Sequence, residues 1–530
     1  MNSVIPARQV VAGMTNLDRT VLARSMDFLY IDRDSFVSLI LSIPMKKLTY
    51  LIFAISLALS LAGCASIERL LRGTSPLERF QSNIDAILAD SNFTATRTGI
   101  KIVSLDNNDV LYERNSKALL RPASNLKLLT TATALSTLGK DFSIKTNLYA
   151  DTVMTDSTLH GNIYLKGFGD PDFNSLQLAG LLSALRWNGI SKIEGNIIGD
   201  HSYFDDQRWG AGWMWDDEPF GFAAYNSALS INRNCIDVTV SPGTAIGDPA
   251  SVIIDPPTQY VWVENKATTC EDTLPSTLEI SRRFAERLNV ITVKGKVPRA
   301  SQPQKDPITV LGPEMYFLTL AKEELGRQHI FFNGNILLDT LPTRARLIAQ
   351  HSQRIDSMIV FLNKVSDNLS AENTLKIIAA EIFGQPGTTE HGISAVKRVL
   401  SSFGVDTTKF LMVDGSGVSH YNLLTPEIYI QLLRGMFSRK DIFDLYFASL
   451  PNAGVDGSLE NRMKNSAAQN NLHAKTGTIG GVSTLSGYVR TAEGEMLGFS
   501  MMMQNYIGAS DPYRKAQDAI GILMANLKRK

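Results

Sequence analysis

The chain has 530 residues, of which 44% are hydrophobic and 20% charged, so it is long enough for several hydrophobic cores and too apolar for a disordered chain. Lysine plus arginine and aspartate plus glutamate both number 52, and this zero net charge argues against nucleic acid as a partner. The seven histidines are scattered without His-x-x-x-His spacing, and no glycine-rich phosphate loop is present. The sequence therefore predicts neither a metal site nor a cofactor.

The N-terminal region has the layout of a secretory signal. Residues 45–47 read Met-Lys-Lys, residues 48–61 are mostly apolar, and Leu-Ala-Gly leads into Cys64. The apolar stretch is too short to span a membrane. Residues 45–63 resemble a bacterial lipoprotein signal, which implies lipidation of Cys64 and, because Ala65 rather than aspartate follows, the outer membrane of a Gram-negative cell. The alternative is an ordinary signal with an incidental cysteine, and both interpretations predict a periplasmic protein.

Two further segments flank this signal. Residues 1–44 precede what is already a complete signal, so we interpret them as the product of an upstream start codon. A genuine cytoplasmic extension is the alternative. Residues 65–78 are expected to form a tether between the lipidated cysteine and the folded chain.

The following elements alternate between strand and helix patterns. Residues 100–113 predict a hairpin around an Asp-Asn-Asn-Asp turn. A helix follows from Ser124, opened by Pro122 and ended by Gly139. Residues 147–344 contain short β-runs broken by proline, glycine and aspartate, which predicts a β-rich insertion of one or two subdomains.

The last part of the chain returns to helical patterns. Helices are predicted within 355–404 and 425–450. Residues 473–489 predict two strands joined by a Gly-Gly turn, and residues 483–504 predict a hairpin. A last helix is expected after Asp511.

The segment Ser124-Asn125-Leu126-Lys127 places a serine and a lysine three positions apart on one helical face. A serine hydroxyl becomes a strong nucleophile only when a base takes its proton, and lysine is that base only where burial or nearby charge lowers its pKa. Ser124 also begins its helix, where unpaired backbone amides favour negative charge on a bound carbonyl. The motif predicts a nucleophile, Ser124, and a base, Lys127, in a partly buried cleft.

Two later motifs supply polar groups suited to the same cleft. Ser366-Asp367-Asn368 offers a hydroxyl and an amide from a turn, which suit proton relay near the lysine and contact with a substrate amide. Lys475-Thr476-Gly477 lies on a predicted strand edge, along which a substrate could pair its backbone. Lys475 and the threonine hydroxyls would hold a terminal carboxylate, and Gly477 would allow close approach.

Each motif alone also has a structural interpretation, because a helix cap, a polar turn and a strand end are common uses of these residues. In this order, however, the three form the signature of penicillin-binding proteins and class A β-lactamases. Ser366 follows Ser124 by 242 positions. A compact β-lactamase-like domain needs far fewer, so the spacing indicates a large insertion.

With this spacing, the chain resembles the low-molecular-mass class C penicillin-binding proteins, the D-alanyl-D-alanine carboxypeptidase/endopeptidase family of serine peptidases. Further segments in family order support the resemblance, namely residues 165–171, 212–217, 227–230, 414–419 and 456–459. The resemblance implies an α+β penicillin-binding/β-lactamase-like transpeptidase fold, in which a five-stranded antiparallel sheet with helices stands beside a helical subdomain. The catalytic domain would comprise residues 79–146 and 345–530, split by the β-rich insertion 147–344.

The resemblance also implies roles for the motif residues. Ser124 would form the acyl-enzyme and Lys127 would act as its base, although which group takes the proton is disputed for related enzymes. The backbone amides of Ser124 and Thr478 would form the oxyanion hole. The remaining implied site residues are Ser366, Asn368 and Lys475 in catalysis and Thr476 and Gly477 in substrate binding.

The insertion carries less specific predictions. In the family, Trp213 and Asp216 would receive the far end of a peptide stem, and packing of the domain interface is the alternative for Trp213. Cys235 and Cys270 are the cysteines left after Cys64. In an oxidising periplasm such a pair is expected to form one disulfide.

The expected function is therefore a serine D-Ala-D-Ala carboxypeptidase, with endopeptidase activity on cross-links, that acts on peptidoglycan stem peptides and is inhibited by β-lactams. A lipid anchor would be its only membrane contact. Three alternatives stay open: a β-lactamase, a D-amino-acid amidase or esterase on the same scaffold, and a non-catalytic wall-binding lipoprotein.

Overall fold

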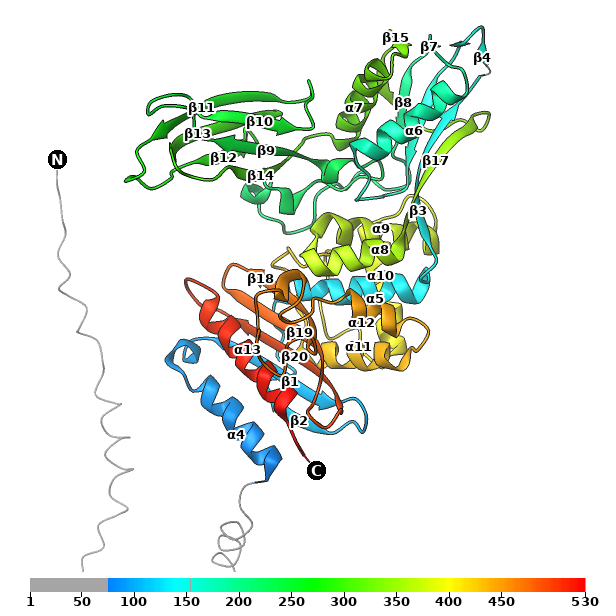
Figure 1. The fold of residues 1–530 in the computed structure, drawn as a ribbon. Coiled ribbons are helices and arrows are strands. Elements are labelled where there is room, and N and C mark those ends of the chain that lie inside the picture. The colour runs from blue at the N-terminus through cyan, green and yellow to red at the C-terminus, as the bar shows by residue number, and fades with distance from the viewer. Residues whose placement is uncertain (1–74, 153, 530) are drawn as a thin grey trace, which may run out of the picture. The chain divides into compact units, whose positions relative to one another are not determined.

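The computed structural model describes residues 75–152 and 154–529, and Figure 1 labels its helices and strands. The predicted extension, the signal, Cys64 and most of the tether lie outside the described residues. The first described helix, α4 (Pro76–Leu88), begins inside the range predicted for the tether. In the described part of the chain, no helix is long and apolar enough to cross a membrane.

A five-stranded antiparallel sheet lies at the centre of the catalytic domain, which confirms the predicted fold class. Its order is β18-β19-β20-β1-β2, and every neighbouring pair is antiparallel. The strands are β1 (Arg97–Ser104), β2 (Val110–Arg114), β18 (His473–Ile479), β19 (Val482–Arg490) and β20 (Met496–Gln504). The predicted hairpins therefore fall where the sequence placed them.

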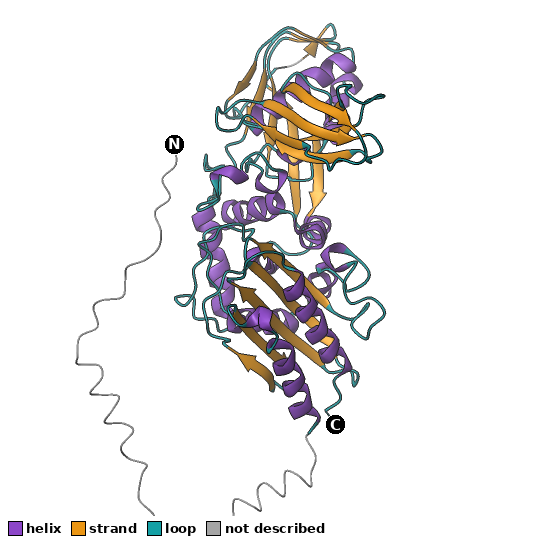
Figure 2. Cartoon of the chain, turned by 90° about the vertical axis from the view of Figure 1, so that its left-hand side faces the viewer, coloured by secondary structure: helices purple, strands orange, loops and turns teal. Residues whose placement is uncertain are grey.

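Both faces of this sheet are covered by helices. Successive side chains of a strand point to opposite faces, and accordingly Met501 and Met503 lie in one hydrophobic core while Met502 lies in another. α13 (Asp511–Asn526) and α4 pack on the first side, and α11 (Pro426–Ser438) packs on the second. Figure 2 shows helices lying across the sheet. The central strand β20 is buried along its whole length as a result.

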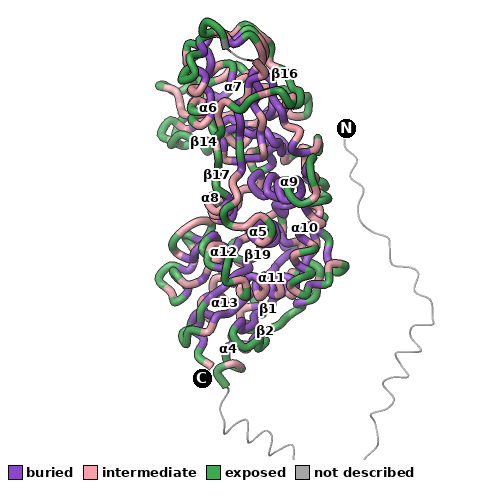
Figure 3. The backbone as a smooth tube through the Cα atoms, turned by 90° about the vertical axis from the view of Figure 1, so that its right-hand side faces the viewer, coloured by how far each residue is buried: buried purple, intermediate pink, exposed green. Residues whose placement is uncertain are grey.

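A helical layer next to the sheet carries the first two motifs. It contains α5 (Lys127–Thr137), α8 (Ile355–Phe361), α9 (Asn368–Phe383), α10 (Thr389–Ser402) and α12 (Phe443–Ser449). α5 packs against α9 and α10 and is buried over residues 127–135 (Figure 3). Its threonines are tolerated there because their hydroxyls donate to backbone carbonyls. Thr131 Oγ1 donates within the helix to Lys127 O at 2.8 Å, and Thr130 Oγ1 donates to Gly415 O at 2.7 Å.

The insertion leaves and re-enters the catalytic domain through two paired antiparallel strands, β3 (Ser143–Ala150) and β17 (Arg346–Arg354). They form a mixed sheet of order β16-β8-β6-β3-β17 with β6 (Ile163–Gly167), β8 (Ile197–Asp200) and β16 (Ile336–Leu338). Helices α6 (Ser175–Trp187) and α7 (Pro313–Arg327) pack against this sheet. The sequence interpretation missed both helices, although Asn174 and Gln177 form a capping box at the start of α6.

The rest of the insertion consists of small sheets. Two have three strands, with orders β10-β9-β14 and β11-β13-β12, and one has the order β15-β7-β5-β4. Their strands are β4 (Met154–Thr155), β5 (Thr158–Leu159), β7 (Lys192–Ile193), β9 (Cys235–Ser241), β10 (Ser251–Asp255), β11 (Trp262–Cys270), β12 (Glu279–Arg282), β13 (Val290–Pro298), β14 (Gln304–Thr309) and β15 (Phe331–Phe332).

The expected disulfide is absent, and that prediction is wrong for this structure. Cys235 and Cys270 are both buried and both free. Cys235 begins β9 and Cys270 ends β11, so the two residues belong to different three-stranded sheets. Cys235 packs with Ala224 and Leu369, and a buried free thiol of this kind behaves as a small apolar side chain.

Candidate active site

The first motif lies where the chain enters α5. Ser124 belongs to a 3-10 turn, Ala123–Leu126, and Lys127 begins the α-helix proper. Lys127 Nζ donates a hydrogen bond to Ser124 Oγ over 3.0 Å. Ala123 adopts a left-handed backbone with φ 46°, an uncommon conformation for a residue with a β-carbon. Such local strain is typical of functional sites, and here it precedes the predicted nucleophile.

Lys127 is completely buried and has three acceptors around its ammonium group. Besides Ser124 Oγ, these are Asn368 Oδ1 at 2.6 Å and Ser416 O at 2.8 Å. Burial lowers the pKa of Lys127 to about 8, against the opposing effect of nearby carboxylates, of which Asp414 is the strongest. An amine with this pKa is partly neutral near physiological pH, which is the state that can take a proton from a hydroxyl.

The second motif forms a turn that joins two helical segments. Ser366 ends the π-helical turn Leu362–Ser366 and has a left-handed φ of 66°. Asp367 then caps α9, since its carboxylate accepts a hydrogen bond from Ser370 N. Asn368 begins α9 and is fixed from both ends of its amide: Oδ1 accepts from Lys127, and Nδ2 donates to Phe222 O of the insertion over 2.7 Å. The insertion therefore contacts the predicted catalytic set directly.

The third motif lies on β18, beside the turn that holds Ser124. Lys475 is completely buried, and burial followed by the positive charge of Lys127 lowers its pKa well below the usual range. A β-carbon added at Gly477 would lie 3.0 Å from Ser124 N and 2.9 Å from Pro122 O. Glycine is required here because the strand runs in backbone contact with the Ser124 turn. Thr478 follows on the same strand and is exposed.

Asn125 holds the Ser124 turn against the third motif. With its amide oriented so that both of its ends find partners, Asn125 donates to Lys475 O at 2.7 Å and to Thr484 Oγ1 at 3.1 Å and accepts from Ser486 Oγ at 2.7 Å. The residue is fully buried, so these contacts satisfy a polar group that would otherwise destabilise the fold. The side chain between the serine and the lysine thus aligns the first motif with β18 and β19.

Two carboxylates near Lys127 were not predicted as site residues. Glu372 of α9 accepts from Gly415 N and Ser416 N, and burial raises its pKa. Asp414 accepts from Gly417 N and Ser419 N in the next turn of the same loop. Together they orient the loop that presents Ser416 O to Lys127. For Asp414 the sequence signal was the Asp-Gly-Ser-Gly run within residues 414–419, whereas Glu372 lies among mixed polar and apolar residues that give no such signal.

The two insertion residues predicted to bind a stem peptide differ in their surroundings. Trp213 is 7% exposed, and its Nε1 donates to Asp414 Oδ2 over 3.0 Å. Its ring also meets Trp209 edge-on at 5.2 Å. This geometry favours the interface role that was the alternative for Trp213. Asp216 lies in the 3-10 turn Trp215–Asp217 and is exposed.

A cavity of about 650 Å³ opens beside the Ser-Asp-Asn turn on the side of the insertion. Ser366 and Asn368 line it from the catalytic domain, and Phe222, Arg233 and Asp172 line it from the insertion. The Arg233 guanidinium lies over the Phe361 ring at 3.9 Å and reaches Asp367 and Asp172 at the longer distances of 3.5 and 3.4 Å. The candidate site therefore has additional room next to its catalytic groups.

This fold and this arrangement of Ser124, Lys127, the Ser-Asp-Asn turn and the Lys-Thr-Gly strand define the class of penicillin-reactive serine acyl-transfer proteins. The fold matches penicillin binding protein 4 (DacB) from Haemophilus influenzae with a TM-score of 0.76 at 24% identity, over 84% of this chain and 99% of that chain. A structure of the same protein complexed with a β-lactam matches with a TM-score of 0.70, over 82% and 97% of the two chains.

Sequence comparison then identifies the family. Residues 80–527 match the D-Ala-D-Ala carboxypeptidase 3 (S13) family, and the chain belongs to it. It is 33% identical over 464 residues to the D-alanyl-D-alanine carboxypeptidase of Actinomadura sp. (strain R39), covering 85% of each chain. It is also 29% identical over 421 residues to the D-alanyl-D-alanine carboxypeptidase DacB of Haemophilus influenzae, covering 78% of this chain and 86% of that one.

Proposed function

We propose that the protein is a serine D-Ala-D-Ala carboxypeptidase that cleaves peptidoglycan stem peptides through an acyl-enzyme on Ser124. The observation that carries the proposal is the hydrogen bond between Ser124 Oγ and the buried Lys127, whose pKa is lowered to about 8. A solvated lysine would be protonated at neutral pH and could not accept the serine proton. The family and its carboxypeptidase relatives support the same reaction.

In the first half of the reaction, neutral Lys127 takes the Ser124 proton while Oγ attacks the carbonyl of the penultimate D-alanine. The carbonyl oxygen gains negative charge, and the backbone amides of Ser124 and Thr478 would donate to it. The close packing of Gly477 against Ser124 N supports this assignment, because it brings the two backbone segments together. The terminal D-alanine then leaves as its amine receives the proton.

The second half reverses these steps with water. Neutral Lys127 takes a proton from water as the water oxygen attacks the acyl carbonyl. It then donates this proton to Ser124 Oγ as the ester bond breaks, and the shortened stem departs. Lys475 with Thr476 and Thr478 would bind the carboxylate of the terminal D-alanine, since the negative charge of a bound carboxylate favours the protonated, hydrogen-bond-donating form of Lys475. Ser366 and Asn368 would complete the proton network and hold the scissile amide.

Endopeptidase activity is part of the proposal. The bond after a D-alanine in a cross-link has the same acyl part and differs in the leaving group. The cavity of about 650 Å³ beside Ser366 offers space for such a larger group. Hydrolysis of isolated cross-linked dimers, compared with uncross-linked pentapeptides, measures the balance between the two activities.

The decisive experiment is to incubate the protein with a labelled penicillin and to locate the adduct by mass spectrometry. The label is expected on Ser124 and is expected to vanish in Ser124→Ala. Ser136→Ala, a serine change on the same helix, serves as the matched control and should label normally. A label on another residue, or labelling of Ser124→Ala, would show that the proposal is wrong.

The same labelling experiment separates the alternatives. Slow release of the bound penicillin argues against a β-lactamase, which needs fast deacylation. Hydrolysis of D-amino-acid amides or esters in preference to D-Ala-D-Ala peptides would favour an amidase or esterase. Absence of both labelling and hydrolysis would favour a non-catalytic wall-binding protein.

We also propose that the protein is periplasmic and anchored through a lipid on Cys64, which lies outside the described residues. The signal-like residues 45–63 and the cell-wall enzymes among the relatives support this location. Cys64→Ser is expected to release the protein from the membrane fraction. Ala65→Asp should move it from the outer to the inner membrane. Cys64→Ser protein that still fractionates with membranes would contradict the anchor.

A further inference from the structure

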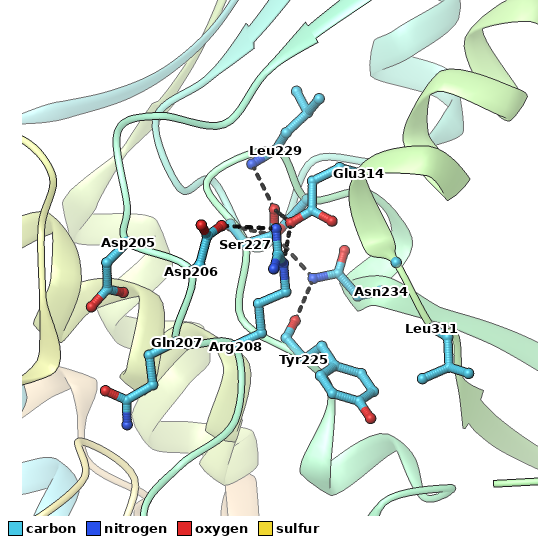
Figure 4. Close-up of polar contacts among 12 residues, drawn as sticks. Asp205, Asp206, Gln207, Arg208, Tyr225, Ser227, Leu229, Asn234, Leu311 and Glu314 are labelled. Atoms are coloured by element: carbon cyan, nitrogen blue, oxygen red, sulfur yellow. Dashed lines mark hydrogen bonds and ion pairs between the residues drawn. The ribbon is translucent and has the colours of Figure 1, made fainter. Parts of the chain in front are cut away.

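An open pocket of about 610 Å³ lies on the insertion, apart from the cavity beside Ser366. Its lining combines aromatic rings with charged groups. The lining residues are Asp206, Arg208, Trp209, Trp215, Glu218, Tyr225, Phe284, Ala285 and Arg287. Figure 4 shows part of the polar wall, where Asp206 and Arg208 lie together near Tyr225.

The aromatic rings form two packed pairs. Trp215 stacks at a tilt on Phe284 with ring centroids 5.1 Å apart, and Trp209 lies 5.2 Å from Tyr225. Trp215 nevertheless remains 69% exposed. A large ring that is held by a neighbour and still faces water offers a flat apolar surface at little entropic cost. It is the kind of surface that a ligand with an apolar face can cover.

The polar groups of the pocket are planar and held in position. Arg208 donates from Nε to Glu314 over 2.8 Å and from Nη2 to Asp206 over 3.2 Å. Glu218 is 8% exposed and pairs through Oε1 with the buried Arg282. Oε1 also accepts from the Tyr225 hydroxyl, and the second oxygen, Oε2, is buried without a hydrogen-bond partner among the described residues. Fixed carboxylates and guanidinium groups of this kind bind pairs of hydroxyl or amide groups.

These features favour a sugar ring over a peptide. The lining residues lie in loops and in the 3-10 turn Trp215–Asp217, outside the strands, so an extended peptide has no strand edge to pair with. A pyranose presents an apolar C–H face, which packs on an aromatic ring, and a rim of hydroxyl groups, which bind planar polar side chains. The pocket offers both kinds of group, the exposed aromatic ring and the planar polar side chains.

We propose that this pocket binds an N-acetylhexosamine unit of the glycan strand that carries the substrate peptide. This inference rests on the proposed function, because it assigns a second part of the same polymer to the same protein. The pocket is connected to the active site through packed side chains: Trp209 contacts Trp213, and Trp213 donates to Asp414. A strand bound there would hold its stem peptides close to the catalytic domain and raise their effective concentration.

The test is binding of peptide-free glycan strands, prepared from peptidoglycan by removing the stem peptides. The parent protein is expected to bind them, and Trp215→Ala is expected to weaken binding by about tenfold. Arg287→Gln, which removes an exposed charge from the same pocket, should weaken binding by a smaller factor. Trp187→Ala is the matched control, because Trp187 lies on α6 of the same insertion, is 87% exposed and does not line the pocket.

Three results would overturn the proposal: no binding of peptide-free strands by the parent, equal binding by Trp215→Ala and Trp187→Ala, or binding only when stem peptides are present. Thermal unfolding of each variant establishes that a loss of binding is not a loss of folding. Penicillin labelling of Ser124 in the parent separates the two proposals. A protein that is labelled but does not bind strands contradicts the glycan pocket alone, whereas one that binds strands without being labelled contradicts the proposed function alone.

Discussion

Around Lys127 the catalytic domain uses buried side chains whose identities matter. The insertion reaches the surrounding residues through a backbone carbonyl, one aromatic side chain and the longer contact of Arg233 with Asp367. Lys127 contacts Ser124 and Asn368 through side-chain atoms. The insertion supplies Phe222 O to Asn368 and Trp213 Nε1 to Asp414. A backbone carbonyl can be provided by any residue, so the insertion can vary in sequence and still complete the site. The comparison predicts large effects for changes in the catalytic domain and small ones for changes in the insertion.

The largest effect is expected for Lys127→Ala. Among the residues that the structure describes, it removes the one group that is both buried with a lowered pKa and bonded to Ser124 Oγ, so acylation by penicillin should slow by roughly 10²–10⁴-fold. The rate of labelling measures this directly. Lys140→Ala, an exposed lysine just after the same helix, is the control and should label at the parent rate. Equal rates for the two variants would remove Lys127 from the mechanism.

Gly477→Ala is expected to slow acylation by about 10²-fold. The added β-carbon would meet Thr484 Oγ1 at 2.3 Å and backbone atoms of the Ser124 turn at 2.9–3.0 Å, so the strand and the nucleophile must separate. Gly480→Ala is the matched control, because a β-carbon there meets no atom within 4 Å. Acylation kinetics and thermal unfolding of the two variants measure the effect. A Gly477→Ala protein as fast as Gly480→Ala would show that close packing of β18 is not needed.

The site residues that could be predicted from the sequence are those that lie in a short recognisable motif. Ser124, Ser366 and Lys475 each lie in a short motif next to a helix start or a strand, and the structure brings these motifs together. Glu372 could not be predicted, because its role depends on a loop 43 positions away. The positions of Cys235 and Cys270 in the sequence likewise do not indicate that the two residues lie in different sheets. The features that could not be predicted are contacts between residues far apart in the sequence, and most of these contacts involve the insertion.

A smaller effect is expected for the pH dependence of the acylation rate, which depends on charges in the catalytic domain. Below its pKa Lys127 is protonated and cannot accept the serine proton, so the rate should rise with pH and reach half its maximum near pH 8. The negative charge of Asp367 raises the pKa of Lys127, and Asp367→Asn should therefore move the midpoint to lower pH. Asparagine can still cap α9. Penicillin acylation rates between pH 5 and 10 give the midpoints.

Asp172→Asn is the control for this shift. Asp172 lines the cavity beside Ser366 but is not among the charges that chiefly shift the pKa of Lys127, so the midpoint of Asp172→Asn should stay close to that of the parent. A midpoint that moves to higher pH in Asp367→Asn would contradict the assigned electrostatics. A parent rate that does not rise with pH would mean that a group other than Lys127 takes the proton.

The smallest effect tests the insertion itself. Trp213→Phe keeps an aromatic ring at the interface but removes the hydrogen bond to Asp414, so we expect the protein to be destabilised by about 1–2 kcal/mol. Trp187→Phe, on an exposed surface of the insertion, should change stability by less than about 0.5 kcal/mol. Urea unfolding measures both. Unchanged stability of Trp213→Phe combined with weaker binding of stem peptides would instead assign this tryptophan to the substrate, and the insertion would then act through side-chain identity as the catalytic domain does.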